Sequence, residues 1–280
     1  MTPNQPAIAP PSRFWADLGT DDFASLDLSR AIAVLPVAAI EQHGPHLPLS
    51  VDTDIAQGVV AASLPHLPAD LPALFLPVQA VGFSPEHRAF PGTLSLSVQT
   101  LTLLWTELAE SIHASGVRKL LIFNTHGGQV GALDLVARDL RARLEMLVYT
   151  SSWFNLPLID ESGQDVMARF PAREHRFGIH AGEIETALML ALRPDRVRME
   201  RAGDFRSSSE QRAGEFGLLG NGRSAKLAWQ TQDLNASGAV GNAAAATAEN
   251  GQALLNAAGR ALAVLLTEID RLPPDTLRRR

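Results

Sequence analysis

Short apolar segments alternate with amphipathic segments along most of the chain. The apolar segments predict strands at 31–40, 73–78, 119–124 and 145–151. The first of them is almost wholly apolar, which is typical of a strand buried on both faces of a parallel sheet. It contains Pro36, which has no amide hydrogen to donate, so we expect this strand to lie at a sheet edge or to carry a bulge.

Segments with apolar residues three and four positions apart predict the helices. They cover 54–64, 101–115, 130–143 and 183–192. An alanine-rich segment at 243–266 predicts a longer helix, with Gly251 and Gly259 as the points where it could break. The polar stretch 203–223 is rich in glycine, serine and arginine and predicts a long loop.

The order of these elements predicts the fold class. Strands that alternate with helices indicate a three-layer α/β/α sandwich with a mostly parallel central sheet. We find no internal repeat and no shift in composition that would mark a second domain. We therefore expect a single domain over residues 14–272. The proline-rich residues 1–13 predict a disordered lead-in, and residues 273–280 predict a solvated tail.

The composition excludes several classes of protein. The 280 residues include no cysteine, which rules out disulfides, thiolate metal sites and cysteine nucleophiles. Lysine and arginine number 24 against 30 acidic residues, for a net charge of −6, which argues against binding to nucleic acid. The apolar runs are too short or too often interrupted to span a membrane, and no secretory signal is visible. We expect a cytoplasmic protein.

Metal-binding residue types follow the first predicted strand. Glu41 and His43 are two positions apart and share one face if the strand conformation continues. Gly-Pro and Leu-Pro steps then turn the chain and could bring Asp52 back beside them. Two carboxylates and an imidazole in one loop suit a hard or borderline metal ion. The alternative is a polar loop in which Asp52 or Asp54 caps the next helix, and Asp54 suits that role better.

Two further histidines occupy comparable positions. His126 follows the third predicted strand and precedes two glycines, which would allow close backbone approach to a ligand or form an anion-binding turn. His180 and Glu183 are three positions apart at the head of a predicted helix, where they would be neighbours, whereas Glu185 would point away. The alternative for the glutamates is a favourable interaction with the helix dipole.

A fourth segment, after the second predicted strand, contains Glu86 and His87. Both could face a substrate, although Pro85, Pro91 and Gly92 make a purely structural loop an equally good account. The chain has no Gly-x-Ser-x-Gly elbow, which disfavours an α/β-hydrolase, and no G-x-G-x-x-G fingerprint after the first strand, which disfavours dinucleotide binding.

Four separated blocks together resemble the creatininase family of metal-dependent amidohydrolases. The resemblance implies a three-layer single domain and two divalent metal ions per subunit. Because the chain lacks cysteine, the ligands must be oxygen and imidazole nitrogen, a set that suits zinc, manganese or iron. The blocks are Glu41-Gln42-His43-Gly44-Pro45-His46-Leu47-Pro48, Phe90-Pro91-Gly92-Thr93, Asn124-Thr125-His126-Gly127-Gly128 and His180-Ala181-Gly182-Glu183-Ile184-Glu185-Thr186.

The resemblance implies a ligand role for each matching residue. Glu41 and His43 would bind one metal each, Asp52 would bridge both, and His126 would complete the first site. Creatinine-hydrolysing members of the family carry a glutamate two positions beyond this last histidine, where our chain has Gly128.

The ligand missing at position 128 must come from elsewhere or be water. Glu183 is our candidate, because it would share a helical face with His180, and Glu185 is the alternative. His180 matches the family's acid/base histidine, so His180 and Glu183 are the predicted catalytic pair.

The resemblance also bears on the substrate. Creatinine-specific members stack their substrate under a tryptophan at the position of Arg176, so creatinine is not the expected substrate, and Arg176 points to an acidic or phosphate-bearing one. Glu86, His87 and Trp153 are further candidates for contacts with the substrate, with Trp153 as an aromatic wall.

We therefore predict a metal-dependent amidohydrolase that acts on a C–N bond in a non-peptide amide, either cyclic or formamide-like, through water activated at a two-metal centre. One alternative is a family member that trims a modified peptide during cofactor maturation. The other is a non-catalytic small-molecule-binding scaffold on the same fold. The resemblance further implies a homo-oligomer, often a hexamer, for which the alanine-rich C-terminal helix could supply an interface.

Overall fold

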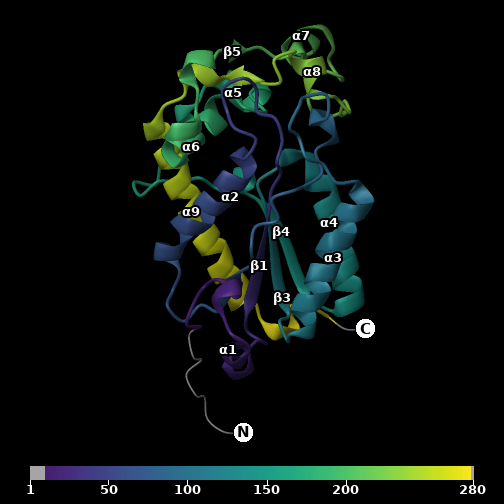
Figure 1. Ribbon diagram of the computed structural model, residues 1–280, viewed down its shortest axis with the longest axis vertical. Coiled ribbons are helices and arrows are strands. Elements are labelled where there is room, and N and C mark those ends of the chain that lie inside the picture. The colour runs from purple at the N-terminus through teal and green to yellow at the C-terminus, as the bar shows by residue number, and fades with distance from the viewer. Residues whose placement is uncertain (1–9, 279–280) are drawn as a thin grey trace.

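Four parallel strands form the centre of the computed structural model, which describes residues 10–278 (Figure 1). They lie in the order β2-β1-β3-β4, and every pairing between them is parallel. This arrangement confirms the predicted parallel sheet. The strands are β1 (Ile32–Val37), β2 (Ala73–Phe75), β3 (Lys119–Asn124) and β4 (Leu147–Ser152).

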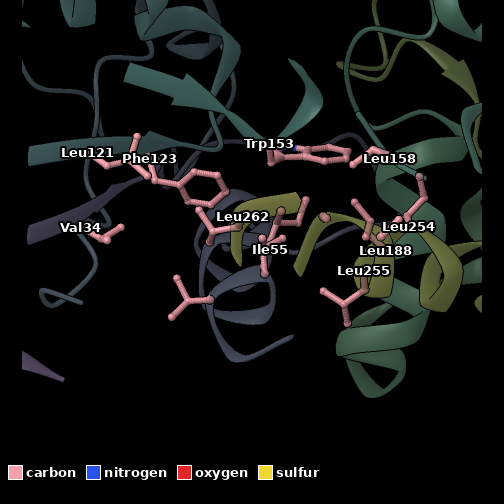
Figure 2. Close-up of a cluster of buried hydrophobic side chains, with 14 of the residues drawn as sticks. Val34, Ile55, Leu121, Phe123, Trp153, Leu158, Leu188, Leu254, Leu255 and Leu262 are labelled. Carbon is pink, nitrogen blue, oxygen red and sulfur yellow. The ribbon is translucent and has the colours of Figure 1, made fainter. Parts of the chain in front are cut away.

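Helices cover both faces of the sheet and give the predicted three-layer sandwich. Side chains alternate along β1, so that Ile32 and Val34 join one hydrophobic core, shown in part in Figure 2, while Ala33 and Leu35 join the other. The first core includes residues of α2 (Val51–Ser63), α6 (Glu183–Leu192) and α9 (Ala248–Arg271). The second includes residues of α3 (Val98–Ala114) and α4 (Val130–Leu144).

Pro36 does not lie on an edge strand, contrary to the prediction. β1 has β2 on one side and β3 on the other. The carbonyl of Pro36 accepts a hydrogen bond from the amide of Gln79, on the side of β2, and β2 has already ended at Phe75. Its missing amide hydrogen would face the same side, because N–H and C=O of one residue in a parallel strand point the same way. The proline therefore removes no hydrogen bond from the sheet.

Helix α9 runs without a break through Gly251 and Gly259. Both glycines allow close approach of backbones: a Cβ at Gly251 would lie 1.8 Å from the carbonyl oxygen of Ala187 in α6, and one at Gly259 would lie 2.5 Å from the carbonyl carbon of Ala62 in α2. The apolar face of α9 thus packs on α2 and α6 of the same chain. An interface between subunits through this helix stays a prediction.

Elements between α6 and α9, together with α5, gather at one end of the molecule, at the top of Figure 1. The stretch expected to be a long loop contains β5, which pairs with β6 in an antiparallel ribbon, and one helix. Short local hydrogen-bonded elements of this kind are hard to see in a polar sequence without apolar periodicity. The elements in this region are α5 (Ala172–Phe177), β5 (Asp204–Phe205), α7 (Ser208–Glu215), α8 (Thr231–Leu234) and β6 (Gly241–Asn242).

The chain ends of the described part lie near the opposite end of the molecule (Figure 1). Most of the predicted lead-in, residues 1–9, lies outside the described residues. Arg13, at its end, is held by hydrogen bonds to the carbonyls of Leu71 and Pro68, and α1 (Thr20–Ser25) follows. Within residues 10–278, no helix has both the length and the apolar character needed to cross a bilayer.

Candidate metal centre

Four segments bring acidic and histidine side chains to the carboxyl edge of the sheet. The loop after β1 carries Glu41 and His43, and a hydrogen bond from the amide of Glu41 to the carbonyl of Leu49 closes it. This closure returns the chain to the start of α2, where Asp52 lies. The hydroxyl of Thr125, beside His126 in the loop after β3, donates to the carbonyl of Asp52 at 2.8 Å. As expected for a parallel sheet, ligand-type residues meet where the strands end.

One group of ligand atoms consists of Glu41, Asp52 and His126. His126 Nδ1 lies 3.3 Å from Oε2 of Glu41 and 3.5 Å from Oδ2 of Asp52. Both oxygens are buried and have no hydrogen-bond partner. Nε2 of His126 lies 3.0 Å from the carbonyl of Phe83 and donates to it, which leaves a lone pair on Nδ1. Three lone pairs thus converge in a buried space, as a metal ion requires.

A second group consists of His43, Asp52 and Glu185. His43 Nε2 lies 3.9 Å from Oδ1 of Asp52 and 4.0 Å from Oε2 of Glu185. Nδ1 of His43 donates to the carbonyl of Glu41 at 3.0 Å, so its buried and unpartnered Nε2 faces the group as an acceptor. Asp52 therefore contributes one oxygen to each group and joins the two.

The charges of the centre are strongly unbalanced without a cation. Four carboxylates face it, those of Glu41, Asp52, Glu86 and Glu185, and within residues 10–278 every ion-pair partner of these four is a histidine. Burial, followed by the charge of Glu41, raises the pKa of Asp52 well above its ordinary value. Burial alone would lower the pKa of His126, but the carboxylates, with Glu41 first among them, raise it to about 10. Such a site favours positive charge.

His87 holds the remaining oxygen of Glu41. Its Nε2 lies 3.2 Å from Oε1 of Glu41. The amide nitrogen of Gln42 lies 2.7 Å from Nδ1 of His87 and can only donate to it, so the proton of His87 is on Nε2, the nitrogen that faces Glu41. Both nitrogens of His87 are thus occupied by contacts that orient Glu41, while its ring also lines the cavity over the centre, and its predicted contact with a substrate stays a prediction.

His180 stacks between His43 and His87, with ring centroids 4.2 and 4.3 Å away. Its Nε2 donates to the carbonyl of Gln42 at 2.7 Å. This leaves Nδ1 as an acceptor, 3.7 Å from Oε1 of Glu41. Burial, and then the charge of His180, lower the pKa of His43 well below its ordinary value, which keeps that ring neutral as a metal ligand must be.

The geometry does not place Glu183 beside the candidate ligands. Its amide is held by the carboxylate of Glu174, and its pKa is raised by burial and by that same Glu174. His180 does not lie on the helix, contrary to the spacing used to predict Glu183, because α6 begins only at Glu183. Ala181 has a φ of 52° and turns the chain, so that the carboxylate of Glu185 folds back onto the amide of Ala181 and reaches His43.

Two adjoining cavities lie over the centre. The inner cavity measures about 200 Å³ and is lined by residues that include Glu41, Asp52, His126, His180, Glu185 and Trp229. The second, which we call the vestibule, measures about 640 Å³ and is lined by residues that include Glu86, Arg176, Phe177, Ile179, Leu227 and Trp229. Both cavities share Glu86, Ile179 and Trp229 in their walls. A ligand can therefore extend from the centre toward residues 219–230.

Trp153 is not part of either cavity wall. It lies in the first hydrophobic core beside Leu158 and is 3% exposed (Figure 2). The tryptophan that lines both cavities is instead Trp229. It could not be predicted as a site residue because it lies in a polar stretch without a motif. Arg176 lines the vestibule rather than the inner cavity, and its guanidinium donates to the carbonyl of Gly220 at 3.0 Å.

Known proteins resemble this chain over most of its length. The family model for creatininase, described as creatinine amidohydrolase, matches residues 16–266. The mycofactocin precursor peptide peptidase of Mycobacterium tuberculosis is 36% identical over 191 residues, which cover 66% of this chain and 68% of that protein. The creatinine amidohydrolase of Pseudomonas putida is 30% identical over 186 residues, which cover 62% and 68%.

Solved creatininase structures share the fold. One crystal structure of creatinine amidohydrolase superposes with a TM-score of 0.70 at 25% identity, covering 94% of this chain and all of that one. Among the other matching creatininase structures, one is described as a manganese form and one as a Zn-Zn form.

Proposed function

The chain belongs to the creatininase family of hydrolases, and on that premise we propose that it hydrolyses an amide C–N bond at a centre in which Asp52 joins two groups of residues that would each hold a divalent metal ion. The observation that carries the proposal is the sharing of Asp52 by two groups of ligand atoms. The residues fit metal ions, because buried atoms of Glu41, His43 and Asp52 have no other partner. Zinc, manganese or iron suits this set of oxygen and imidazole ligands.

Two divalent ions at such a centre supply a water activated near neutral pH and polarise the amide carbonyl. The chain's own residues orient the ligands and handle the proton. His87 fixes Oε1 of Glu41, so that Oε2 faces the first group. His180 borders the inner cavity. Its Nε2 donates to the carbonyl of Gln42, so its Nδ1 is the nitrogen that can accept a proton. We assign it the transfer of a proton to the leaving nitrogen.

The substrate that we favour is the end of a short or modified peptide, the alternative to the non-peptide amide predicted first. A small cyclic amide needs only the inner cavity of about 200 Å³, whereas the adjoining vestibule of about 640 Å³ offers room for a longer chain. The relatives that are peptidases by name support the same choice. A cyclic or formamide-like amide is the second candidate, supported by the description of the family model.

We expect the purified protein to hold two divalent ions per chain. Chelation should abolish hydrolysis, because the proposed reaction depends on water activated by the metal ions, and addition of manganese, zinc or iron should restore it. Metal analysis and a panel of short peptides, formamides and cyclic amides test this, with faster turnover of peptides expected. Less than one ion per chain, together with turnover that survives chelation, would contradict the proposal.

Trp229→Ala is expected to raise KM about tenfold with little change in stability, because an aromatic contact contributes roughly 0.5–1.5 kcal/mol and the side chain lines both cavities. The matched variant Trp153→Ala should instead lower the free energy of unfolding by about 3–5 kcal/mol, since it empties a core position. Steady-state kinetics and denaturant unfolding distinguish the two. An unchanged KM in Trp229→Ala would remove this tryptophan from the substrate site.

Several expectations stay predictions for this chain. They are the homo-oligomer, hexamer included, the cytoplasmic location and the limits of the single domain at 14–272. Light scattering on the purified protein tests the first, fractionation of the source cells tests the second, and limited proteolysis tests the third.

A further inference from the structure

The carboxylate of Glu86 occupies the space that a side chain at position 128 would need. A Cβ added to Gly128 would lie 1.8 Å from Oε1 of Glu86 and 2.9 Å from its Cδ. Gly128 does not adopt a left-handed backbone conformation, so the turn itself does not require glycine there. A side chain at position 128 would therefore have to displace the carboxylate of Glu86 and the ring of His126 from their present places, whereas glycine leaves both where they are.

Glu86 is presented to the centre by fixed backbone. It lies in a turn of 3-10 helix (Pro85–His87), and its carbonyl accepts a hydrogen bond from the hydroxyl of Thr231 at 2.9 Å. The residue is only 8% exposed. The backbone of Glu86 is therefore anchored, and its side chain is largely buried beside the centre.

The carboxylate faces the first group of ligand atoms. Oε1 of Glu86 lies 3.5 Å from Nε2 of His126, and Glu86 also groups with Glu41 and His87 in a third set of potential ligands. Glu86 therefore places a carboxylate beside the atoms that would hold a cation.

We propose that Glu86 is a functional carboxylate of the metal centre and that Gly128 is the residue that admits it. The inference rests on the proposed two-metal function. Glu86 supplies from the loop after β2 the acid that is absent at position 128. Its charge strengthens the hold on the cation at Glu41, Asp52 and His126, and its place in both cavity walls puts it beside a bound substrate.

The first test is Glu86→Gln, which keeps the shape of the side chain and removes its charge. We expect the affinity for manganese or zinc, measured by competition with a chelator, to fall roughly 10- to 100-fold, the size of effect seen for partners around metal ligands. The melting temperature of the metal-free protein should not fall, because burial already raises the pKa of Glu86.

A double-mutant cycle with Glu86→Ala and Gly128→Ala tests the steric link. Gly128→Ala alone should weaken metal binding, because its Cβ displaces the carboxylate and also approaches Nε2 of His126. In the Glu86→Ala background, the loss of metal affinity caused by Gly128→Ala should be at least tenfold smaller, because the added Cβ no longer meets a carboxylate. Gly131→Ala, at a nearby glycine with no atom within 4 Å of an added Cβ, is the matched control.

The outcomes separate this inference from the proposed function. If the wild type binds two ions but Glu86→Gln binds them as tightly, or the cycle is additive, the role of Glu86 is wrong and the metal centre stands. If the wild type binds no divalent ion, the proposed function itself fails.

Discussion

Asp52→Asn is expected to abolish hydrolysis and to strip the purified protein of its metal ions. One oxygen of Asp52 faces Glu41 and His126, and the other faces His43 and Glu185. An asparagine has a single oxygen, and its amide nitrogen only donates, so it cannot serve both groups. The loss of activity should exceed the roughly 10–100-fold loss expected when a residue that only orients a metal ligand is removed. Metal analysis together with kcat/KM measures it.

Asp54→Asn is the matched control for this prediction. Asp54 lies two residues further along α2 and accepts a hydrogen bond from the hydroxyl of Ser50 at 2.6 Å, with Arg193 and Arg196 as ion-pair partners. It belongs to neither group of ligand atoms. We expect this variant to keep both ions while its melting temperature drops. If it lost the metals as Asp52→Asn does, the effect at position 52 would reflect the fold of α2.

The stability of the metal-free protein gives a second check on Asp52. Because burial and Glu41 raise its pKa in the folded state, ionised Asp52 lowers the free energy of unfolding as the pH rises from its ordinary value toward the raised one. Asparagine carries no charge to bury. At neutral pH, metal-free Asp52→Asn should therefore be at least as stable as metal-free wild type. A clear loss of stability would show a structural role.

Gly251→Ala is expected to destabilise the protein by about 1–3 kcal/mol, the usual cost of overpacking. Its Cβ would meet the carbonyl group of Ala187, which is backbone and cannot rotate away, so α9 must move from α6. Melting temperature should fall by roughly 2–4 °C per kcal/mol in a protein of this size. Because α6 carries Glu185, affinity for the second metal ion should fall as well.

The control for Gly251→Ala is Gly131→Ala, which also lies in the first turn of a helix, α4. Nothing lies within 4 Å of a Cβ there, so alanine should stabilise the protein by up to about 1 kcal/mol through helix propensity alone. If the two substitutions changed the melting temperature equally, the close contact between Gly251 of α9 and Ala187 of α6 would be contradicted.

The central elements could be predicted from periodicity alone. The bounds of β3 and α6 agree residue for residue with the segments 119–124 and 183–192, because each is an apolar segment with a clear start or end in the sequence. The partners of β1 could not be predicted, since a single strand does not show which neighbours it will have. Pro36 therefore suggested an edge strand. In the structure β2 ends at Phe75, before the position where Pro36 would have to donate a hydrogen bond to it.

The candidate site likewise contains some residues that could be predicted from the sequence and others that could not. Glu41, His43, Asp52 and His126 could be named because they lie in short motifs directly after predicted strands, and the geometry brings them together. The choice of Glu183 over Glu185 failed to match the geometry because it assumed helical spacing from His180, three residues before α6 begins. Trp229 carried no local signal, and Trp153 was equally plausible until its burial in the core was known.

The sequence by itself determined the layers, the edge of the sheet that carries the site and the chemical nature of its ligands, since a chain without cysteine must use oxygen and imidazole nitrogen. These properties depend on local patterns and on composition. Tertiary structure alone decided the rest: which acids lie in each group of potential ligands, that Glu86 lies against Gly128, and which tryptophan lines the cavity. Each of these depends on distances between segments far apart in the chain, such as Glu86 and Gly128, which no periodicity encodes.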